Sequence, residues 1–300
     1  MGSPSEGTES LARRTRRLLR ERGLAPLKSK GQHFLVDQHC AAQIADFAAP
    51  DPSLPVLEIG AGLGALTLEL AARAPHVVAV ELDRGLLAAL RSEGLPPTVT
   101  AVEGDALELD LEALLASHPG RWRATGNLPY YAATAILQRL LLLGSRLERI
   151  VATVQSEVAE RLRARPGDPQ YGSLSVWTAL HAAEVAALLE VPRGAFYPQP
   201  KVDSQVVCLT PREGVPCRPE AQALLLAVVR AAFGQRRKML RNALAELLGR
   251  TPSAQERLAA AMAQAGIAPQ ARGEAASPEQ FVVLAEALAS SEVELTGSDG

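Results

Sequence analysis

The sequence predicts a doubly wound, Rossmann-like α/β domain followed by a small all-α C-terminal domain. From about residue 54 onward, short β-branched or apolar runs alternate with helix-length segments, which indicates a mostly parallel sheet covered by helices. A glycine-rich loop follows the first of these runs, and beyond residue 211 the pattern becomes wholly helical. Ligands of such sheets bind at the carboxyl ends of the strands, so functional residues are expected in the loops there.

The elements are expected in the following order. A short arginine-rich helix, LARRTRRLLRER, precedes Gly23, which stops it. The expected strands are 54–60, 76–82, 98–105, 121–127, 149–155, 184–191 and 204–210. The expected helices between them include 63–74, 83–94 and 132–144, each with apolar residues at helical spacing.

The C-terminal part carries helix-start signals. Pro219 can open a helix that ends at Gly234, Thr251 with Pro252 forms a cap and first position, and SPEQ at 277–280 is a capping box. The expected division is therefore an Arg-rich extension at 1–28, an α/β domain at 29–212, a helical domain at 213–290 and a mobile tail at 291–300.

Composition and charge narrow the class of protein. No apolar run is long enough to span a membrane, and the N-terminus lacks a secretory signal, so a cytoplasmic protein is expected. The three cysteines have no metal-binding spacing, so no metal is expected. The net charge of −2 argues against nucleic-acid binding, but two basic clusters, at 13–22 and 236–241, can each form a positive face.

The glycine loop and two acids suggest a nucleoside-containing cofactor. Gly60, Gly62 and Gly64 lie between a strand and a helix, where they allow a tight turn and close approach of a ligand. Glu81 ends the next strand and can accept both ribose hydroxyls, while Asp105 ends the following one and suits an adenine amino group. The glycines also fit a dinucleotide pattern, so an NAD-dependent oxidoreductase is an alternative.

Glu58 counts against that alternative. A carboxylate two residues before the glycine loop is poorly placed for a pyrophosphate but acceptable beside a sulfonium or an amino group. The three sites together favour S-adenosylmethionine, which carries adenine, ribose and positive charge but no phosphate.

The hexapeptide GNLPYY, at 126–131, completes a set of motifs that resembles a known family. EIGAGLGALT, VELD, EGDAL and GNLPYY, in this order, resemble the adenosine-N6 methyltransferases of ribosomal RNA. Four further segments, KGQHFL, PQYGSLSV, FYPQPKVDS and FGQRRKMLRNAL, extend the likeness to about residues 28–285. The pattern is most similar to the KsgA/RsmA family of small-subunit dimethyltransferases, which implies a class I S-adenosylmethionine-dependent fold. The Arg-rich N-terminal extension is not accounted for.

The chemistry explains such a loop. The N6 lone pair of adenosine is delocalised into the ring, so the nitrogen is a feeble nucleophile. If Asn127 Oδ1 and the Leu128 carbonyl each accept one N6–H, the amino group is drawn toward tetrahedral geometry. Pro129 fixes the backbone and has no N–H to compete for that carbonyl. Tyr130 offers a face on which an extruded adenine stacks.

The resemblance implies further roles. Phe196 is expected over the other face of the target base, His33 and Leu35 along the cofactor, and Gly60 at its methionine end. His33 departs from the Asn common at its position, which leaves its individual hydrogen bond open. In the basic helix expected at 236–244, helical spacing favours Arg237, Lys238 and Arg241 as phosphate contacts, while Arg236 can pair with an acid.

The implied activity is dimethylation, at N6, of two adjacent adenosines in the 3′-terminal hairpin loop of 16S rRNA, late in small-subunit assembly. The expected partner is the small ribosomal subunit, and the protein is expected to be a monomer. Two alternatives remain open: a resistance-type methyltransferase of large-subunit rRNA and a non-catalytic ribosome-assembly factor.

Overall fold

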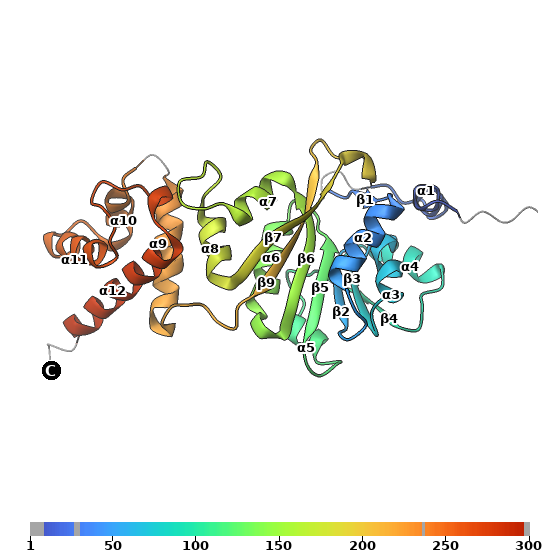
Figure 1. Cartoon of the computed structure of the whole chain (residues 1–300), viewed down its shortest axis with the longest axis horizontal. Helices are drawn as coiled ribbons and strands as arrows, with labels where there is room; N and C mark the ends of the chain where they lie inside the picture. The colour runs from blue at the N-terminus through green and yellow to red at the C-terminus, as the bar shows by residue number, and fades with distance from the viewer. Residues whose placement is uncertain (1–8, 27–30, 236–237, 297–300) are drawn as a thin grey trace, which may run out of the picture. The chain divides into compact units, whose positions relative to one another are not determined.

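The structure is a computed structural model that describes residues 9–26, 31–235 and 238–296 (Figure 1). It contains two compact units. The first comprises Met1–Ala159 and Ala183–Glu213, and the second Glu160–Ala182 and Gly214–Gly300. In the described part of the chain, no helix has the length and apolar character that a membrane span requires.

The first unit is built on a seven-stranded sheet with the order β4-β3-β2-β5-β6-β9-β7. Strands β2 to β6 run parallel, and β9 is antiparallel to β6. The strands are β2 Val56–Ile59, β3 Val77–Glu81, β4 Val99–Glu103, β5 Trp122–Asn127, β6 Leu147–Gln155, β7 Ala182–Val191 and β9 Ser204–Pro211. The predicted doubly wound class is confirmed, because the order reverses at β2, with β3 on one side and β5 on the other.

Helices connect the strands and cover the sheet. They are α2 Gln38–Ala48, α3 Ala65–Ala71, α4 Arg84–Ser92, α5 Leu111–Leu115 and α6 Ala133–Leu142. Helix α7 Ser156–Arg163 follows β6, and its last four residues belong to the second unit. Aspartates start several of these helices: the carboxylate of Asp83, for example, accepts the backbone N–H groups of Gly85 and Leu86 at the start of α4. A two-stranded ribbon, β1 Phe34–Leu35 with β8 Phe196–Tyr197, lies outside the main sheet.

The second unit is helical in its described residues. It contains α8 Ser173–His181, α9 Gln222–Gly234, α10 Leu240–Leu248, α11 Pro252–Gln264 and α12 Pro278–Thr296. Phe281, Leu284 and Leu244 are fully buried in its core. The predicted caps are present: Thr251 Oγ1 accepts the Ala254 N–H, and Ser277 and Gln280 bond reciprocally as a capping box.

The structure differs from the predicted domain division in three places. Residues 160–182, assigned by sequence to the α/β domain, pack with the helical unit, where the Tyr171 hydroxyl donates to the Ala276 carbonyl. Helix α12 continues to Thr296, where a mobile tail was expected from residue 291. The N-terminal helix, α1 Leu11–Glu21, belongs to the first unit, because Leu18 and Leu19 are buried there.

Candidate active site

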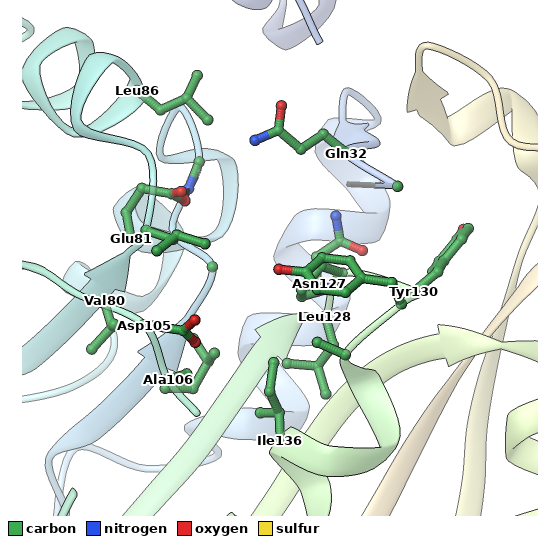
Figure 2. Close-up of a pocket in the computed structure, with 18 of the residues that line it drawn as sticks. Gln32, Val80, Glu81, Leu86, Asp105, Ala106, Asn127, Leu128, Tyr130 and Ile136 are labelled. Atoms are coloured by element: carbon green, nitrogen blue, oxygen red, sulfur yellow. Dashed lines mark hydrogen bonds between the residues drawn. The ribbon is translucent and has the colours of Figure 1, made fainter. Parts of the chain in front are cut away.

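A cavity opens at the carboxyl ends of β2 to β5, where the sequence predicted a ligand site. In Figure 2, Glu81 and Asp105 lie on one side of this cavity and Asn127 and Tyr130 on the other. The residues that line it include Gly31, Gln32, His33, Phe34, Gly60, Gly62, Val80, Glu81, Leu86, Asp105, Ala106, Asn127, Leu128, Pro129, Tyr130 and Ile136. Most of the predicted site residues are therefore brought together by the fold.

The glycine loop is bent by left-handed backbone conformations. Gly62 has a φ of +56°, a backbone conformation that is strained for residues with a side chain. Its N–H donates to Glu81 Oε2 at 2.8 Å. The other carboxylate oxygen of Glu81 accepts the Asp83 N–H, also at 2.8 Å. Glu81 is thus fixed by two backbone donors at the end of β3, and burial raises the pKa of its carboxyl.

Glu58 lies beneath the glycine loop, on a second, smaller cavity that Gly60, Thr15 and Leu35 also line. The side chain is only 1 % exposed, and its Oε2 has no hydrogen-bond partner among the described residues. Burial raises the pKa of Glu58 to about 7; the nearby Thr67 hydroxyl opposes this rise, and the charge of Glu81 adds a smaller contribution to it. A buried carboxyl with an unused oxygen is suited to a positively charged ligand group.

Asp105 follows β4 and begins a loop that α6 holds in place. Its Oδ1 accepts the Leu107 N–H at 2.8 Å. Arg139 of α6 donates to the Ala106 and Leu109 carbonyls at 2.7 and 2.8 Å. The neighbouring cavity wall is apolar, as an adenine ring requires; it includes Val80, Leu82, Leu86, Ala106 and Ile136.

The loop after β5 is held by contacts on both sides. A side chain at Gly126 would place its Cβ 2.3 Å from the carbonyl oxygen of Ile59, so only glycine allows β5 to approach β2 here. The Leu128 N–H donates to the Thr153 carbonyl at 3.2 Å. Among the described residues, no hydrogen bond reaches the Leu128 carbonyl oxygen, which leaves it available as an acceptor.

The amide of Asn127 is oriented by His33. Its Nδ2 donates to the backbone carbonyl of His33 at 2.7 Å, and because a carbonyl can only accept, the opposite orientation of the amide is excluded. Oδ1 of Asn127 therefore faces away from His33. No hydrogen bond to this oxygen occurs within the described ranges.

The rings beside this loop are also fixed. The Tyr130 hydroxyl lies 2.7 Å from Ser204 Oγ, and its ring lies 5.2 Å from that of His33, centroid to centroid. His33 Nδ1 donates to the Pro198 carbonyl at 2.6 Å, so this nitrogen carries the proton and Nε2 remains as the other ring nitrogen.

Two predicted site residues, Leu35 and Phe196, are not among the residues that line the main cavity. Phe196 is 3 % exposed and packs in the core of the first unit, paired with Leu35 across the β1–β8 ribbon. Leu35 is likewise 3 % exposed and borders only the smaller cavity beside Glu58. Both side chains are expected along a bound ligand; in this structure they make packing contacts, and their roles toward a ligand stay predictions.

The basic residues near the C-terminus are not arranged as predicted. Arg236 and Arg237 lie outside the described residues. Lys238 precedes α10, which begins only at Leu240, so the expectation that Lys238 and Arg241 share a helix face is wrong. Lys238 Nζ pairs with Glu246 Oε1 at 2.8 Å, while Arg241 is exposed on α10.

Comparison of the sequence with known protein families gives a match over most of the chain. The sequence model described as ribosomal RNA adenine dimethylase matches residues 27–290. The chain belongs to the ribosomal RNA adenine dimethylase family. This membership confirms the predicted enzyme class, an S-adenosylmethionine-dependent adenine methyltransferase, and the NAD-dependent alternative is not supported.

Individual members of the ribosomal RNA adenine dimethylase family and solved structures agree. "Ribosomal RNA small subunit methyltransferase A" of Moorella thermoacetica is 45 % identical over 92 % of this chain and 96 % of that protein. Its namesake from Geobacter metallireducens is 41 % identical over 90 % of this chain and 98 % of that protein. The crystal structure of the 23S rRNA methyltransferase ErmE is 31 % identical with a TM-score of 0.62, and it covers 85 % of this chain and 99 % of that one.

The side chains that line the site fit the cofactor of the ribosomal RNA adenine dimethylase family. Carboxylates stand at two neighbouring strand ends, apolar side chains flank Asp105, and Glu58 has an unused buried oxygen for a cationic group. Sequence reasoning missed two supporting residues, Ser204 and Arg139. The Ser of the FYPQPKVDS segment was a usable signal for the first, whereas no local pattern marks Arg139, whose partners lie about thirty residues earlier in the chain.

Proposed function

We propose that this protein transfers methyl groups from S-adenosylmethionine to N6 of two adjacent adenosines in the 3′-terminal hairpin loop of 16S rRNA, giving N6,N6-dimethyladenosines late in small-subunit assembly. The observation that carries the proposal is the orientation of Asn127, whose Oδ1 is left as a hydrogen-bond acceptor beside the cofactor cavity. The names of the relatives at 45 % and 41 % identity support the small subunit as the partner. The proposal includes a cytoplasmic, monomeric protein that needs no metal ion.

Asn127 and Leu128 act on the nucleophile. Asn127 Oδ1 and the Leu128 carbonyl oxygen each accept one N6–H of the target adenosine, which localises the nitrogen lone pair. Both acceptors are preorganised, because His33 holds the amide and Thr153 holds the Leu128 backbone. Acceptors fixed in advance need little reorganisation during the reaction, which is the main source of catalysis available here. As the N6–CH3 bond forms, the S–CH3 bond breaks and the sulfonium leaves as a neutral thioether; the positively charged N6 then releases its proton to solvent.

S-adenosylmethionine supplies the methyl group as a sulfonium, and the chain's residues hold its parts. Glu81 accepts ribose hydroxyls, Asp105 accepts from the adenine amino group, and Gly60 and Gly62 let the methionine end approach the backbone. His33 lines the same cavity, with its ring fixed by the Pro198 carbonyl. Leu35 contributes packing behind the cofactor.

The target base is held by aromatic stacking. Tyr130 offers the first face, and its hydroxyl bond to Ser204 fixes the ring. Phe196 is proposed for the other face; since it is buried here, RNA binding must be accompanied by movement of the β8 segment for its ring to reach the base. Stacking is worth about 1–3 kcal/mol per base.

We also propose that Arg237, Lys238 and Arg241 contact rRNA phosphates. Exposure of Arg241 supports this role for that residue. Lys238 would have to give up its ion pair with Glu246 to bind a phosphate. We therefore expect Lys238 to contribute less to RNA affinity than Arg241.

The experiment uses labelled S-adenosylmethionine with unmodified small subunits, large subunits and protein-free 16S rRNA. We expect transfer to small subunits, mapped to two adjacent adenosines, and none with an Asn127→Ala variant. The likeness to ErmE makes large-subunit rRNA the second candidate. Transfer to large subunits alone would establish that candidate and overturn the proposal.

A further inference from the structure

Helix α1 forms part of the wall around the cofactor site. Leu18 and Leu19 are 1 % and 5 % exposed, and they pack in a cluster with Phe34 and Leu86, both of which line the main cavity. Thr15, 2 % exposed, borders the smaller cavity beside Glu58 and the glycine loop. The segment is therefore a fixed element of the first unit with a defined inner face.

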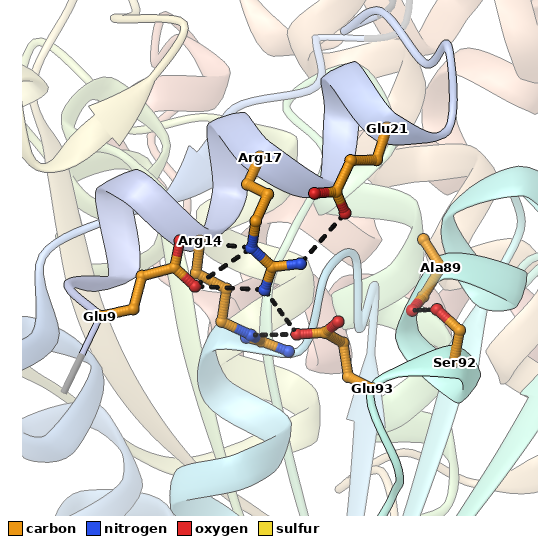
Figure 3. Close-up of polar contacts among 7 residues, drawn as sticks. All are labelled: Glu9, Arg14, Arg17, Glu21, Ala89, Ser92 and Glu93. Atoms are coloured by element: carbon orange, nitrogen blue, oxygen red, sulfur yellow. Dashed lines mark hydrogen bonds and ion pairs between the residues drawn. The ribbon is translucent and has the colours of Figure 1, made fainter. Parts of the chain in front are cut away.

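A cluster of ion pairs fixes which face of α1 is turned toward α4. Arg14 Nε and Arg17 Nη2 lie 3.3 and 3.0 Å from the same oxygen, Oε2 of Glu93, just after α4 (Figure 3). Arg17 also pairs with Glu9 and Glu21 on either side, both at 3.1 Å. Two of the six arginines of this segment are thus neutralised within the protein, and they are turned toward α4.

The outer face of α1 carries a second set of arginines. Arg13, Arg16 and Arg20 are all exposed, and their offsets of three and seven residues place them within about 60° of one another around the helix. Across the described residues, no carboxylate pairs with any of the three. We call these three residues the arginine stripe. Unlike Arg14 and Arg17, they are available to an external anion.

One member of the arginine stripe, Arg16, is linked through Tyr197 to the loop after β5 that carries Asn127 and Leu128, here called the catalytic loop. Arg16 Cζ is 5.3 Å from the centroid of the Tyr197 ring. Tyr197 pairs with Phe34 across the β1–β8 ribbon, and His33, immediately before Phe34, accepts the hydrogen bond of Asn127. A short run of direct contacts therefore joins the stripe to the residue that holds the target amino group.

We infer that the arginine stripe binds the phosphate backbone of the RNA next to the target adenosine. This inference rests on the proposed function. An extruded base must be presented by a backbone that is itself held, and exposed guanidinium groups suit phosphates because each offers several donors in a plane. On a chain of net charge −2, three unpaired arginines on one face concentrate positive potential at this place.

The test measures binding to unmodified small subunits across a salt series for three proteins. These are the wild type, the triple variant Arg13→Gln, Arg16→Gln, Arg20→Gln, and a control, Arg121→Gln. Glutamine keeps the side chain long and the helix favoured but removes the charge. Arg121 is also exposed in the first unit but precedes β5, at the opposite end of the strand from the catalytic loop.

We expect the triple variant to lose roughly 2.1–2.7 units of log–log salt slope, because each of the three phosphate contacts contributes roughly 0.7–0.9. The ratio of wild-type affinity to variant affinity then falls by roughly 20- to 40-fold between about 50 and 200 mM salt. The affinity for S-adenosylmethionine, measured by calorimetry, should not change. Arg121→Gln should leave the slope within about 0.3 of the wild type.

The two possible failures are distinguishable. If the wild type methylates small subunits in an Asn127-dependent manner while the triple variant keeps the wild-type affinity and slope, the stripe is only a solvated surface and the inference is overturned. If the wild type neither binds nor methylates small subunits, it is the proposed function that has failed. If Arg121→Gln lowers the slope by roughly 0.7–0.9, as much as the loss of one phosphate contact, the charge effect is not local, and the inference is overturned as well.

Discussion

Asn127 Nδ2 donates a hydrogen bond of 2.7 Å to the backbone carbonyl of His33, a residue 94 positions earlier in the chain. This contact decides the chemistry of the loop, because it assigns the amide nitrogen to the protein and leaves the oxygen for a substrate N–H. The segment before β1 is thereby part of the catalytic arrangement, to which it contributes the backbone carbonyl of His33.

Replacement of Asn127 tests this arrangement. Asn127→Ala removes the acceptor and should lower single-turnover methyl transfer by roughly 100-fold or more, about 2.7 kcal/mol in the barrier. Asn127→Asp should also be impaired, since it sets a carboxylate oxygen against the His33 carbonyl. Calorimetry with S-adenosylmethionine should show a much smaller change in both variants. Near-normal transfer by Asn127→Ala would refute the role.

Gly126 should tolerate no side chain. In Gly126→Ala the new Cβ would meet the Ile59 carbonyl oxygen at 2.3 Å, so the loop must shift and methyl transfer should fall at least tenfold. Gly194→Ala is the matched control, because nothing lies within 4 Å of its added Cβ. Transfer rates and thermal unfolding of the two variants give the comparison; equal behaviour would show that the close approach of β5 to β2 is unimportant.

Glu58 should make stability depend on pH in the cofactor-free protein. The folded chain holds the Glu58 proton more tightly than the unfolded chain, since the pKa rises from 4.5 to about 7. Stability from this group is therefore present below pH 4.5 and is lost as pH rises toward 7, by up to about 3 kcal/mol in the free energy of unfolding.

Urea unfolding at pH 5 and pH 8 measures this effect in the wild type and in Glu58→Gln. In Glu58→Gln, the free energy of unfolding should not show the decrease with pH that Glu58 causes. At pH 8 the variant should therefore be more stable, relative to the wild type, than at pH 5. Glu81 titrates in both proteins, so the difference between them measures Glu58 together with its interaction with the Glu81 charge. An identical pH dependence in both would mean that Glu58 ionises normally.

Asp105 should discriminate between nucleoside cofactors. Asp105→Ala should weaken S-adenosylmethionine binding by about 1–3 kcal/mol, the usual penalty for an unpaired buried polar group. NAD should not bind the wild type measurably. Calorimetric titration of both ligands into both proteins checks this, and an unchanged affinity in Asp105→Ala would remove Asp105 from the adenine site.

Tyr130 should act through its ring more than through its hydroxyl. Tyr130→Phe loses the bond to Ser204 but keeps the stacking face, so we expect transfer within a few-fold of the wild type. Tyr130→Ala loses the face itself and should weaken RNA-dependent transfer by roughly 1–3 kcal/mol. Steady-state kinetics with small subunits separates the two; similar losses in both variants would favour the hydroxyl.

The sequence determined the fold class and most of the site by local patterns. Short apolar runs, separated by helix-length segments, predicted every strand of the seven-stranded sheet, because strands that are buried in a sheet need apolar residues. The glycine loop, Glu81, Asp105 and GNLPYY fell at strand ends, and parallel strands bring their carboxyl ends to one edge. Caps at Thr251 and Ser277 were equally local and equally readable.

Only the tertiary structure decided how these pieces face one another. The orientation of Asn127 depends on His33, the loop after Asp105 on Arg139, and the division of the α1 arginines on Glu93. Phe196, for which the resemblance implied a contact with the target base, is buried, and α10 begins only at Leu240, later than local pattern suggested. Each of these features depends on contacts between segments that are distant in sequence. The free energies of such contacts depend on packing and hydrogen-bond geometry, which a local stretch of sequence does not determine.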